Sequence, residues 1–168
     1  NMPAMLSATQ YRPPRWLRNP HLQSMLASSG VRLRRGLRLL AGSGAVTREL
    51  ILDGGEGVRL QAWHSRIPGR APVGLALLLH GWEGSAESSY MRMTAARMLE
   101  HGFDVVRLNF RDHGNTHHRN PGIFHSCRIG EVVHAAGDVA SRFPHLPLVA
   151  AGYSLGGNFA LRLALHAP

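Results

Sequence analysis

The chain has 168 residues, of which 44% are hydrophobic and 17% are charged. A chain of this length and apolar content can bury the core of one domain, so intrinsic disorder is excluded. The nineteen basic residues, all arginine, outnumber the ten acidic ones and give a formal net charge of +9, while the single cysteine, Cys127, excludes an internal disulfide.

The location of the protein is predicted from what the sequence lacks. No apolar run approaches the roughly 20 residues that a transmembrane helix requires, and the N-terminal segment has no apolar core of a signal peptide. A lone cysteine fits a reducing compartment. We therefore predict a cytoplasmic protein.

Residues 1–47 are predicted to form an arginine-rich N-terminal arm. Seven arginines lie between Arg12 and Arg38, and several prolines together with the GSG sequence at 42–44 predict an irregular backbone. Such a charge run is usually a solvated surface, but peripheral contact with an anionic membrane is also consistent with it. A nucleic-acid partner is not expected, because only Tyr11 and Trp16 are interleaved with the arginines as stacking aromatics.

The following residues alternate between strand and helix patterns. The segments ELIL and VRLQAWH, joined by DGGEG, predict an antiparallel pair of strands. The continuous apolar run at 73–81 predicts a strand that is covered on both faces. The segment SSYMRMTAARMLEHG then has apolar residues at helical spacing, a serine to cap its start and Gly102 to end it.

The same alternation continues to the end of the chain. Residues 104–110 predict a strand, 127–143 an amphipathic helix, LPLVAAGYS a further strand and LGGNFALRLALHA a nearly apolar helix. Strands that alternate with helices predict an α/β fold, with a mostly parallel sheet, flanking helices and right-handed crossovers.

The pentapeptide Gly152-Tyr153-Ser154-Leu155-Gly156 lies at a predicted strand-to-helix turn and matches the G-x-S-x-G nucleophile elbow. In such a turn the serine has a strained backbone, and larger residues at the two glycine positions would collide with the neighbouring strand and helix. The turn also directs a helix N-terminus at the bound acyl group. We therefore predict Ser154 as the catalytic nucleophile and the backbone N–H of Leu155 as an oxyanion donor.

A second oxyanion donor is expected from the loop LLLHGWEGS, which follows the buried strand at 73–81. Gly81 lets the chain turn inward, so that the backbone N–H of Trp82 is the natural second donor. His80 is interpreted as a residue that holds this loop by local hydrogen bonds, in preference to one that transfers protons.

Several segments together resemble the α/β-hydrolase superfamily, and within it the YheT-like esterase branch. They are PPRWLRNPHLQS, HGWEGS, NFRDHGNTHH, FHSCRIGEVV and GYSLGGN, in the expected order over most of the chain. The resemblance implies an α/β-hydrolase-type sheet, a serine esterase without a cofactor, a small-molecule or lipid ester substrate, and an arm that packs on the core. It leaves open the roles of Asp112, His113, His117 and His118, where the chain departs from the usual NFRG pattern.

The catalytic acid and base are not found where this fold puts them. The triad of such hydrolases runs Ser, then Asp or Glu, then His along the chain. The fourteen residues after Ser154 contain no carboxylate, and His166, twelve residues along the helix, would lie ~18 Å away. We therefore expect 48–168 to be the N-terminal part of a hydrolase domain, truncated after the helix that follows the elbow and inactive by itself.

Three alternatives remain open at this stage. The first is a non-standard triad, in which His80 or His113 acts with Asp112 or Asp138 on Ser154. The second is a metal-binding loop that uses the cluster Asp112, His113, His117, His118 and His125. The third is a non-catalytic binding module with a hydrolase-like fold.

Overall fold

The computed structural model describes residues 14–27 and 29–166. The chain divides into two compact units between Arg32 and Leu33. The predicted separation of an arm at 1–47 from a hydrolase portion at 48–168 stays a prediction, as does the packing of the arm on the core.

The predicted irregular backbone of the arm is wrong for its described residues. They form the 3₁₀ helix η1 (Arg15–Arg18) and the helices α1 (Pro20–Ala27) and α2 (Gly30–Gly42). Pro20 is the first residue of α1, where a missing N–H costs little, and Asn19 Oδ1 accepts the N–H of His21 at 2.9 Å. Gly42 is the last residue of α2, and Gly44 beyond it has φ +72°. The prolines and the GSG glycines therefore lie at the ends of helices and do not interrupt them.

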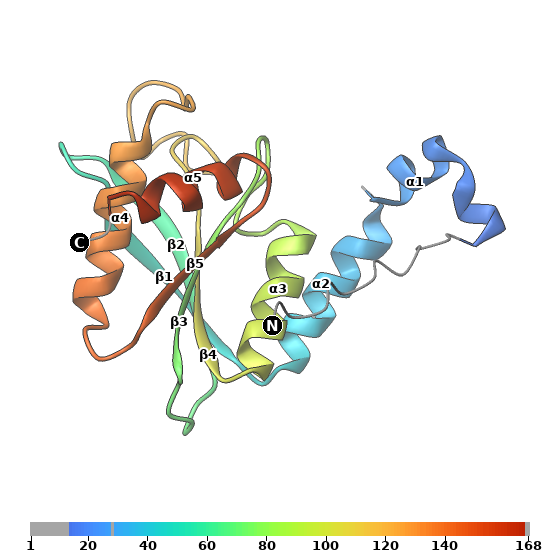
Figure 1. Cartoon of the computed structure of the whole chain (residues 1–168), viewed down its shortest axis with the longest axis horizontal. Helices are drawn as coiled ribbons and strands as arrows, with labels where there is room; N and C mark the ends of the chain where they lie inside the picture. Colours follow the sequence, from blue (N-terminus) through green and yellow to red (C-terminus); the bar gives the residue numbers. More distant parts are fainter. Residues whose placement is uncertain (1–13, 28, 167–168) are drawn as a thin grey trace, which may run out of the picture. The chain divides into compact units, whose positions relative to one another are not determined.

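The second unit contains a five-stranded sheet in the order β1-β2-β4-β3-β5 (Figure 1). The strands are β1 (Val46–Asp53), β2 (Arg59–Arg66), β3 (Gly74–Leu79), β4 (Phe103–Leu108) and β5 (Leu148–Gly152). The β1/β2 and β2/β4 pairs are antiparallel, whereas β3 is parallel to both β4 and β5. Leu79 is opposite Leu108 on one side and Gly152 on the other, so the carboxyl ends of the three parallel strands are level.

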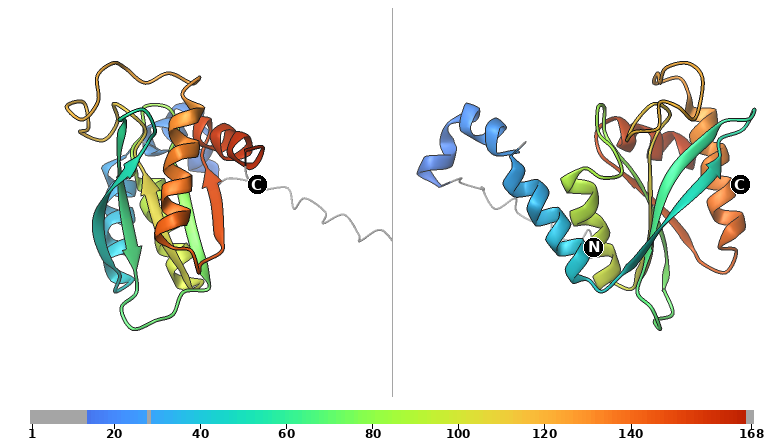
Figure 2. Two further views of the ribbon diagram at one scale, coloured as in Figure 1. Left: turned by 90° about the vertical axis from the view of Figure 1, so that its left-hand side faces the viewer. Right: turned by 180° about the vertical axis from the view of Figure 1, so that it is seen from behind.

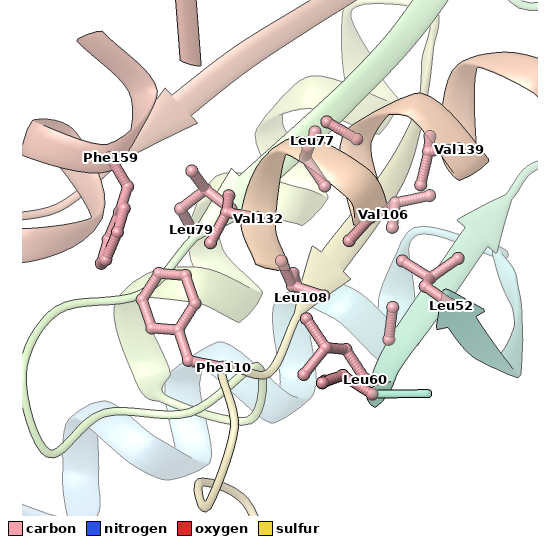
Figure 3. Packing of buried hydrophobic residues seen from close by; sticks show 14 of the residues in the cluster. Leu52, Leu60, Leu77, Leu79, Val106, Leu108, Phe110, Val132, Val139 and Phe159 are labelled. Atoms are coloured by element: carbon pink, nitrogen blue, oxygen red, sulfur yellow. The ribbon is translucent and has the colours of Figure 1, made fainter. Parts of the chain in front are cut away.

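Helices cover both faces of this sheet (Figures 1 and 2). Helix α3 (Ser89–Glu100) packs on one face, and α4 (Ile129–Arg142) and α5 (Leu155–Ala164) on the other. The larger core cluster lies under α4 and α5, where Leu77, Leu79 and Val106 of the sheet meet Val132 of α4 and Phe159 of α5 (Figure 3). The predicted α/β-hydrolase-type architecture is confirmed.

Burial along the strands follows the position of each strand in the sheet. All six residues of β3 are buried, as predicted for a strand that is covered on both faces. In β5 the residues Val149, Ala150 and Ala151 are exposed, because β5 is one of the two edge strands of the described sheet. No helix in residues 14–27 and 29–166 has the length and apolar character that crossing a membrane requires.

Candidate active site

Ser154 lies at the turn between β5 and α5, as predicted. It occupies the N-cap position of α5 with φ 51° and ψ −115°, and its side chain makes no cap hydrogen bond. Non-glycine residues rarely adopt a positive φ, which costs on the order of 1–3 kcal/mol and is found preferentially at functional sites. Ser154 is also exposed, so its hydroxyl is accessible at the carboxyl end of the sheet.

The two glycines of the motif are required by backbone contacts. A Cβ atom on Gly152 would lie 2.1 Å from the carbonyl oxygen of Gly156, and a Cβ on Gly156 would lie 2.3 Å from that of Leu79. Neither contact can be relieved by moving a side chain. The positions of the glycines therefore follow from the close approach of α5 to the ends of β3 and β5.

The loop after β3 lies directly beside the serine. A Cβ on Gly81 would be 3.5 Å from Cβ of Ser154, and the N–H of Tyr153 donates to the carbonyl of Leu79 at 3.1 Å. Trp82 follows with an exposed fraction of 60%, and Glu83 has φ +55°. The structure thus brings together the predicted residues Ser154, Leu155, Gly81 and Trp82.

Tyr90, in the first turn of α3, ties this loop to the elbow and was missed in the sequence analysis. Its hydroxyl accepts the backbone N–H of Gly81 at 3.0 Å. Its ring lies 4.7 Å from the ring of Tyr153, whose hydroxyl bonds to Thr94 on the same helix. A tyrosine at a helix start carries no sequence signal for this role, because the contact depends on how α3 packs against the loop.

His80 holds the oxyanion loop from inside, which confirms the interpretation of it as a structural residue. It is fully buried, its Nδ1 donates to the carbonyl of Gly81 at 2.8 Å, and its Nε2 accepts the N–H of Phe110 at 3.2 Å. Burial lowers the pKa of His80 to about 4, so the ring is neutral near pH 7. Because both ring nitrogens are bonded to backbone groups, His80 is not placed to act as the base.

The other members of the non-standard triad are engaged elsewhere. His113 Nδ1 donates to the carbonyl of Arg111 at 2.8 Å, and Asp112 pairs with His117. Asp138 accepts hydrogen bonds from Arg142 and, at 2.8 Å, from the N–H of Asp53 at the end of β1, the sheet edge opposite to β5. None of these contacts joins a base to Ser154.

The histidine-rich loop does not assemble a metal site among residues 14–27 and 29–166. No three side chains of His, Cys, Asp and Glu are close enough together there to hold an ion. Asp112 and His117 form only a pair, and His118 and His125 are exposed. His166 lies beyond the far end of α5, where its backbone N–H bonds to Leu163, which fits the expected separation from Ser154.

Two polar residues support the loop that follows β3 and were not predicted from the sequence: Arg107 in β4 and Asn109 directly after it. Asn109 Oδ1 accepts the N–H of Ala86 at 2.7 Å, and the buried Arg107 donates to the carbonyl of Ala86 at 2.7 Å and to Glu87 at 3.3 Å. Burial, with the nearby charge of Arg92, lowers the pKa of Arg107 to about 10, so it stays protonated at neutral pH. The sequence did carry one sign of this role, because Arg107 is a charged residue inside the otherwise apolar run VVRLNF.

An aromatic cluster lies beneath the loop and the start of α5. Trp82 is 5.9 Å from Phe124, which stacks on Phe110 at 5.4 Å, and Phe110 in turn lies 5.0 Å from Phe159 of α5. Trp82 is the exposed member, whereas the three phenylalanines are buried. This cluster therefore packs the loop after β3 against the core at the carboxyl end of the sheet.

The class of protein follows from a family model described as "alpha/beta hydrolase fold", which matches residues 76–168, more than half of the chain. The chain therefore belongs to the α/β hydrolase fold family.

Three known proteins show the relationship in more detail. The Escherichia coli protein named "Putative esterase YheT" is 31% identical over 153 residues, 90% of this chain and 42% of that protein. Embryogenesis-associated protein EMB8 of Picea glauca is 26% identical over 157 residues, 90% of this chain and 33% of that protein. The crystal structure of XC6422 from Xanthomonas campestris, described as an a/b serine hydrolase without lid, has a TM-score of 0.62 and 27% identity over 71% of this chain and 56% of that one.

These comparisons confirm the YheT-like resemblance. They also show that the chain spans less than half of the length of the two curated relatives.

Proposed function

We propose that Ser154 is the nucleophile of a serine esterase that cleaves carboxylic esters through an acyl-serine intermediate. The observation that carries the proposal is the positive φ of Ser154 at an exposed turn between two glycines, beside the loop after β3. In the proposed reaction the Ser154 oxygen attacks the ester carbonyl, the alcohol leaves, and water then releases the acid.

The proposed oxyanion donors are the backbone N–H groups of Leu155 and Trp82. Leu155 is the first residue of α5, and the first N–H groups of a helix have no intrahelical acceptor. The N–H of Gly156, by contrast, already donates to the carbonyl of Tyr153 at 2.9 Å. Removal of one such donor typically reduces turnover by ~10²–10³-fold, so the loop after β3 would make a substantial contribution beside that of the nucleophile.

The proposal assigns the acid and base to segments that this chain does not contain. The relatives are more than twice as long as the matched region, and the histidines and aspartates near the site are bonded to other groups. A serine without its base keeps only the assistance of the oxyanion hole, so we expect little turnover from the 168-residue chain. An ester substrate is proposed from the Escherichia coli relative named a putative esterase, and we take its class to be small-molecule or lipid esters.

The test is chemical rescue of acylation, followed by intact mass. The chain is incubated with p-nitrophenyl acetate with and without imidazole, which can replace an absent histidine base. We expect slow addition of one acetyl group, faster with imidazole, lost in Ser154→Ala and retained in the control Ser126→Ala, which alters another exposed serine. Acetylation that is unchanged in Ser154→Ala would refute the proposal and favour a non-catalytic binding module.

A further inference from the structure

Helix α2 presents an unusual outer surface within the second unit. Arg34, Arg35 and Arg38 are exposed there, and they lie among Leu33, Leu37 and Leu39, whose exposed fractions are 45%, 45% and 40%. We call Arg34, Arg35, Leu37 and Arg38 the α2 basic surface, because Leu33 and Leu39 are three residues from the buried Gly36 and lie only about 60° round the helix from it. Half-exposed leucines beside arginines are typical of helices that lie in a membrane interface, whereas a solvated helix usually has polar residues in such places.

The orientation of this surface is fixed by Gly36. It is the buried residue of α2, and a Cβ on it would lie 2.9 Å from the carbonyl oxygen of Ser89 at the start of α3. Arg34 and Arg38 are each two residues from Gly36, so at about 100° per residue they lie about 160° round the helix from that contact. The close packing at Gly36 therefore directs both arginines away from the core.

The positive charge of this surface is not compensated within the described chain. All ten acidic residues lie at or after Glu49, and no carboxylate of the described residues pairs with Arg34, Arg35 or Arg38. Eight arginines between Arg59 and Arg142 do pair with carboxylates. Like charges at i and i+4, such as Arg34 and Arg38, repel each other along a helix, and an anionic surface would relieve that repulsion.

We propose that the α2 basic surface docks on an anionic lipid bilayer. The arginines would bind lipid phosphates, while Leu37, about 100° round the helix from Gly36, would enter the interface between headgroups and acyl chains. Nucleic acid is the less favoured anion, because α2 contains no aromatic residue to stack on bases and its leucines would stay exposed against a phosphate backbone. The proposal does not depend on the esterase chemistry.

The experiment is co-sedimentation of the whole chain with vesicles. Phosphatidylcholine vesicles that contain phosphatidylglycerol are compared with vesicles of phosphatidylcholine alone, from about 0.05 to about 0.5 M salt. We expect binding to the anionic vesicles that weakens with salt. Arg34→Gln/Arg38→Gln should weaken it about thirtyfold, because each arginine near an anionic membrane contributes roughly a factor of five. Leu37→Ser should weaken the binding as well.

The matched control is Arg59→Gln/Arg97→Gln. It also removes two positive charges, but from arginines that pair with Asp53 and Glu100. Its binding should stay within about twofold of the unmodified chain. Far-UV circular dichroism checks that each variant is folded. The proposal is overturned if anionic and neutral vesicles are bound equally, if the control loses as much affinity as the α2 variant, or if duplex DNA is bound while anionic vesicles are not.

Discussion

The hydroxyl of Tyr90 accepts the backbone N–H of Gly81 at 3.0 Å, so a side chain of α3 fixes the loop that lies beside Ser154. Tyr90→Phe leaves that N–H without its partner and should lower the free energy of unfolding by about 1–2 kcal/mol. Urea unfolding measures this. Tyr153→Phe is the control, because its hydroxyl bonds to Thr94 at an exposed site and should matter less. Equal stability of Tyr90→Phe and the unmodified chain would show that the bond does not hold the loop.

Gly156→Ala should be strongly destabilising. Its Cβ would lie 2.3 Å from the carbonyl oxygen of Leu79 and 2.5 Å from that of His80, so backbone would have to move, at a cost on the order of 3 kcal/mol or more. Gly137→Ala is the matched control, because that glycine lies in α4 with no other atom near its Cβ position. It should stabilise by up to about 1 kcal/mol through helix propensity. Similar melting temperatures for the two variants would contradict the close approach.

The buried His80 should make stability depend on pH. The unfolded chain takes up a proton at this residue below about pH 6.5, whereas the folded chain does so only near pH 4. The stabilisation is therefore complete above pH 6.5 and is lost as the pH falls from 6.5 towards 4, by at most about 1.4 kcal/mol per pH unit. Urea unfolding at several pH values should show a shallower slope in His80→Gln. The control is His125→Gln, which alters an exposed histidine. If the free energy of unfolding depends as steeply on pH in His80→Gln as in this control, groups other than His80 cause the pH dependence.

Arg107→Met should destabilise the loop after β3. Arg107 is 2% exposed and donates to the carbonyl of Ala86 at 2.7 Å, so its loss leaves a buried acceptor unpaired. We expect a loss of about 2–3 kcal/mol, less than for a fully buried ion pair because Glu87 is half-exposed. Arg97→Met removes an exposed pair with Glu100 and should cost about 0–1 kcal/mol. Comparable losses in the two variants would argue against a supporting role for Arg107.

The open edge of β5 should promote self-association of the chain. Val149 is 40% exposed, and an apolar cavity of about 430 Å³ lies between β5, α4 and α5. Exposed apolar edge strands pair with other chains, and a lysine on the edge opposes this. Val149→Lys should therefore lower the apparent mass in sedimentation velocity at high concentration. Val73→Lys, at an exposed site before β3, should change it less, and the reverse order would exclude the β5 edge as the contact.

The sheet and the elbow could be predicted because their signals are local. The apolar run of β3, the spacing of α3 and α4 and the pentapeptide around Ser154 each lie within a few turns of chain, and the structure has all of them where they were expected. Helix α2 was missed because its flanking glycines and the prolines before α1 were interpreted as disruption throughout the segment. They occupy positions at which helices begin and end.

The supporting residues could not be predicted for a different reason. Tyr90, Arg107 and Asn109 act on the loop at 81–87 through contacts between elements that are far apart in the sequence. Their residue types do not indicate how close they lie to this loop, and a buried arginine in a strand indicates only that it has some partner. A tertiary structure is needed to identify the partner.

The space for Gly152 and Gly156 is bounded by main-chain carbonyls, so the presentation of the serine hydroxyl is largely independent of which side chains fill the neighbourhood. Trp82, which is 60% exposed, can therefore vary in size and polarity without disturbing the bend itself, whereas Phe110 and Phe159 are buried in the core and cannot. For the proposed nucleophile, the presentation of the hydroxyl and the chemistry of the exposed surface beside it are in this sense separately adjustable, which is a route by which one scaffold can diversify.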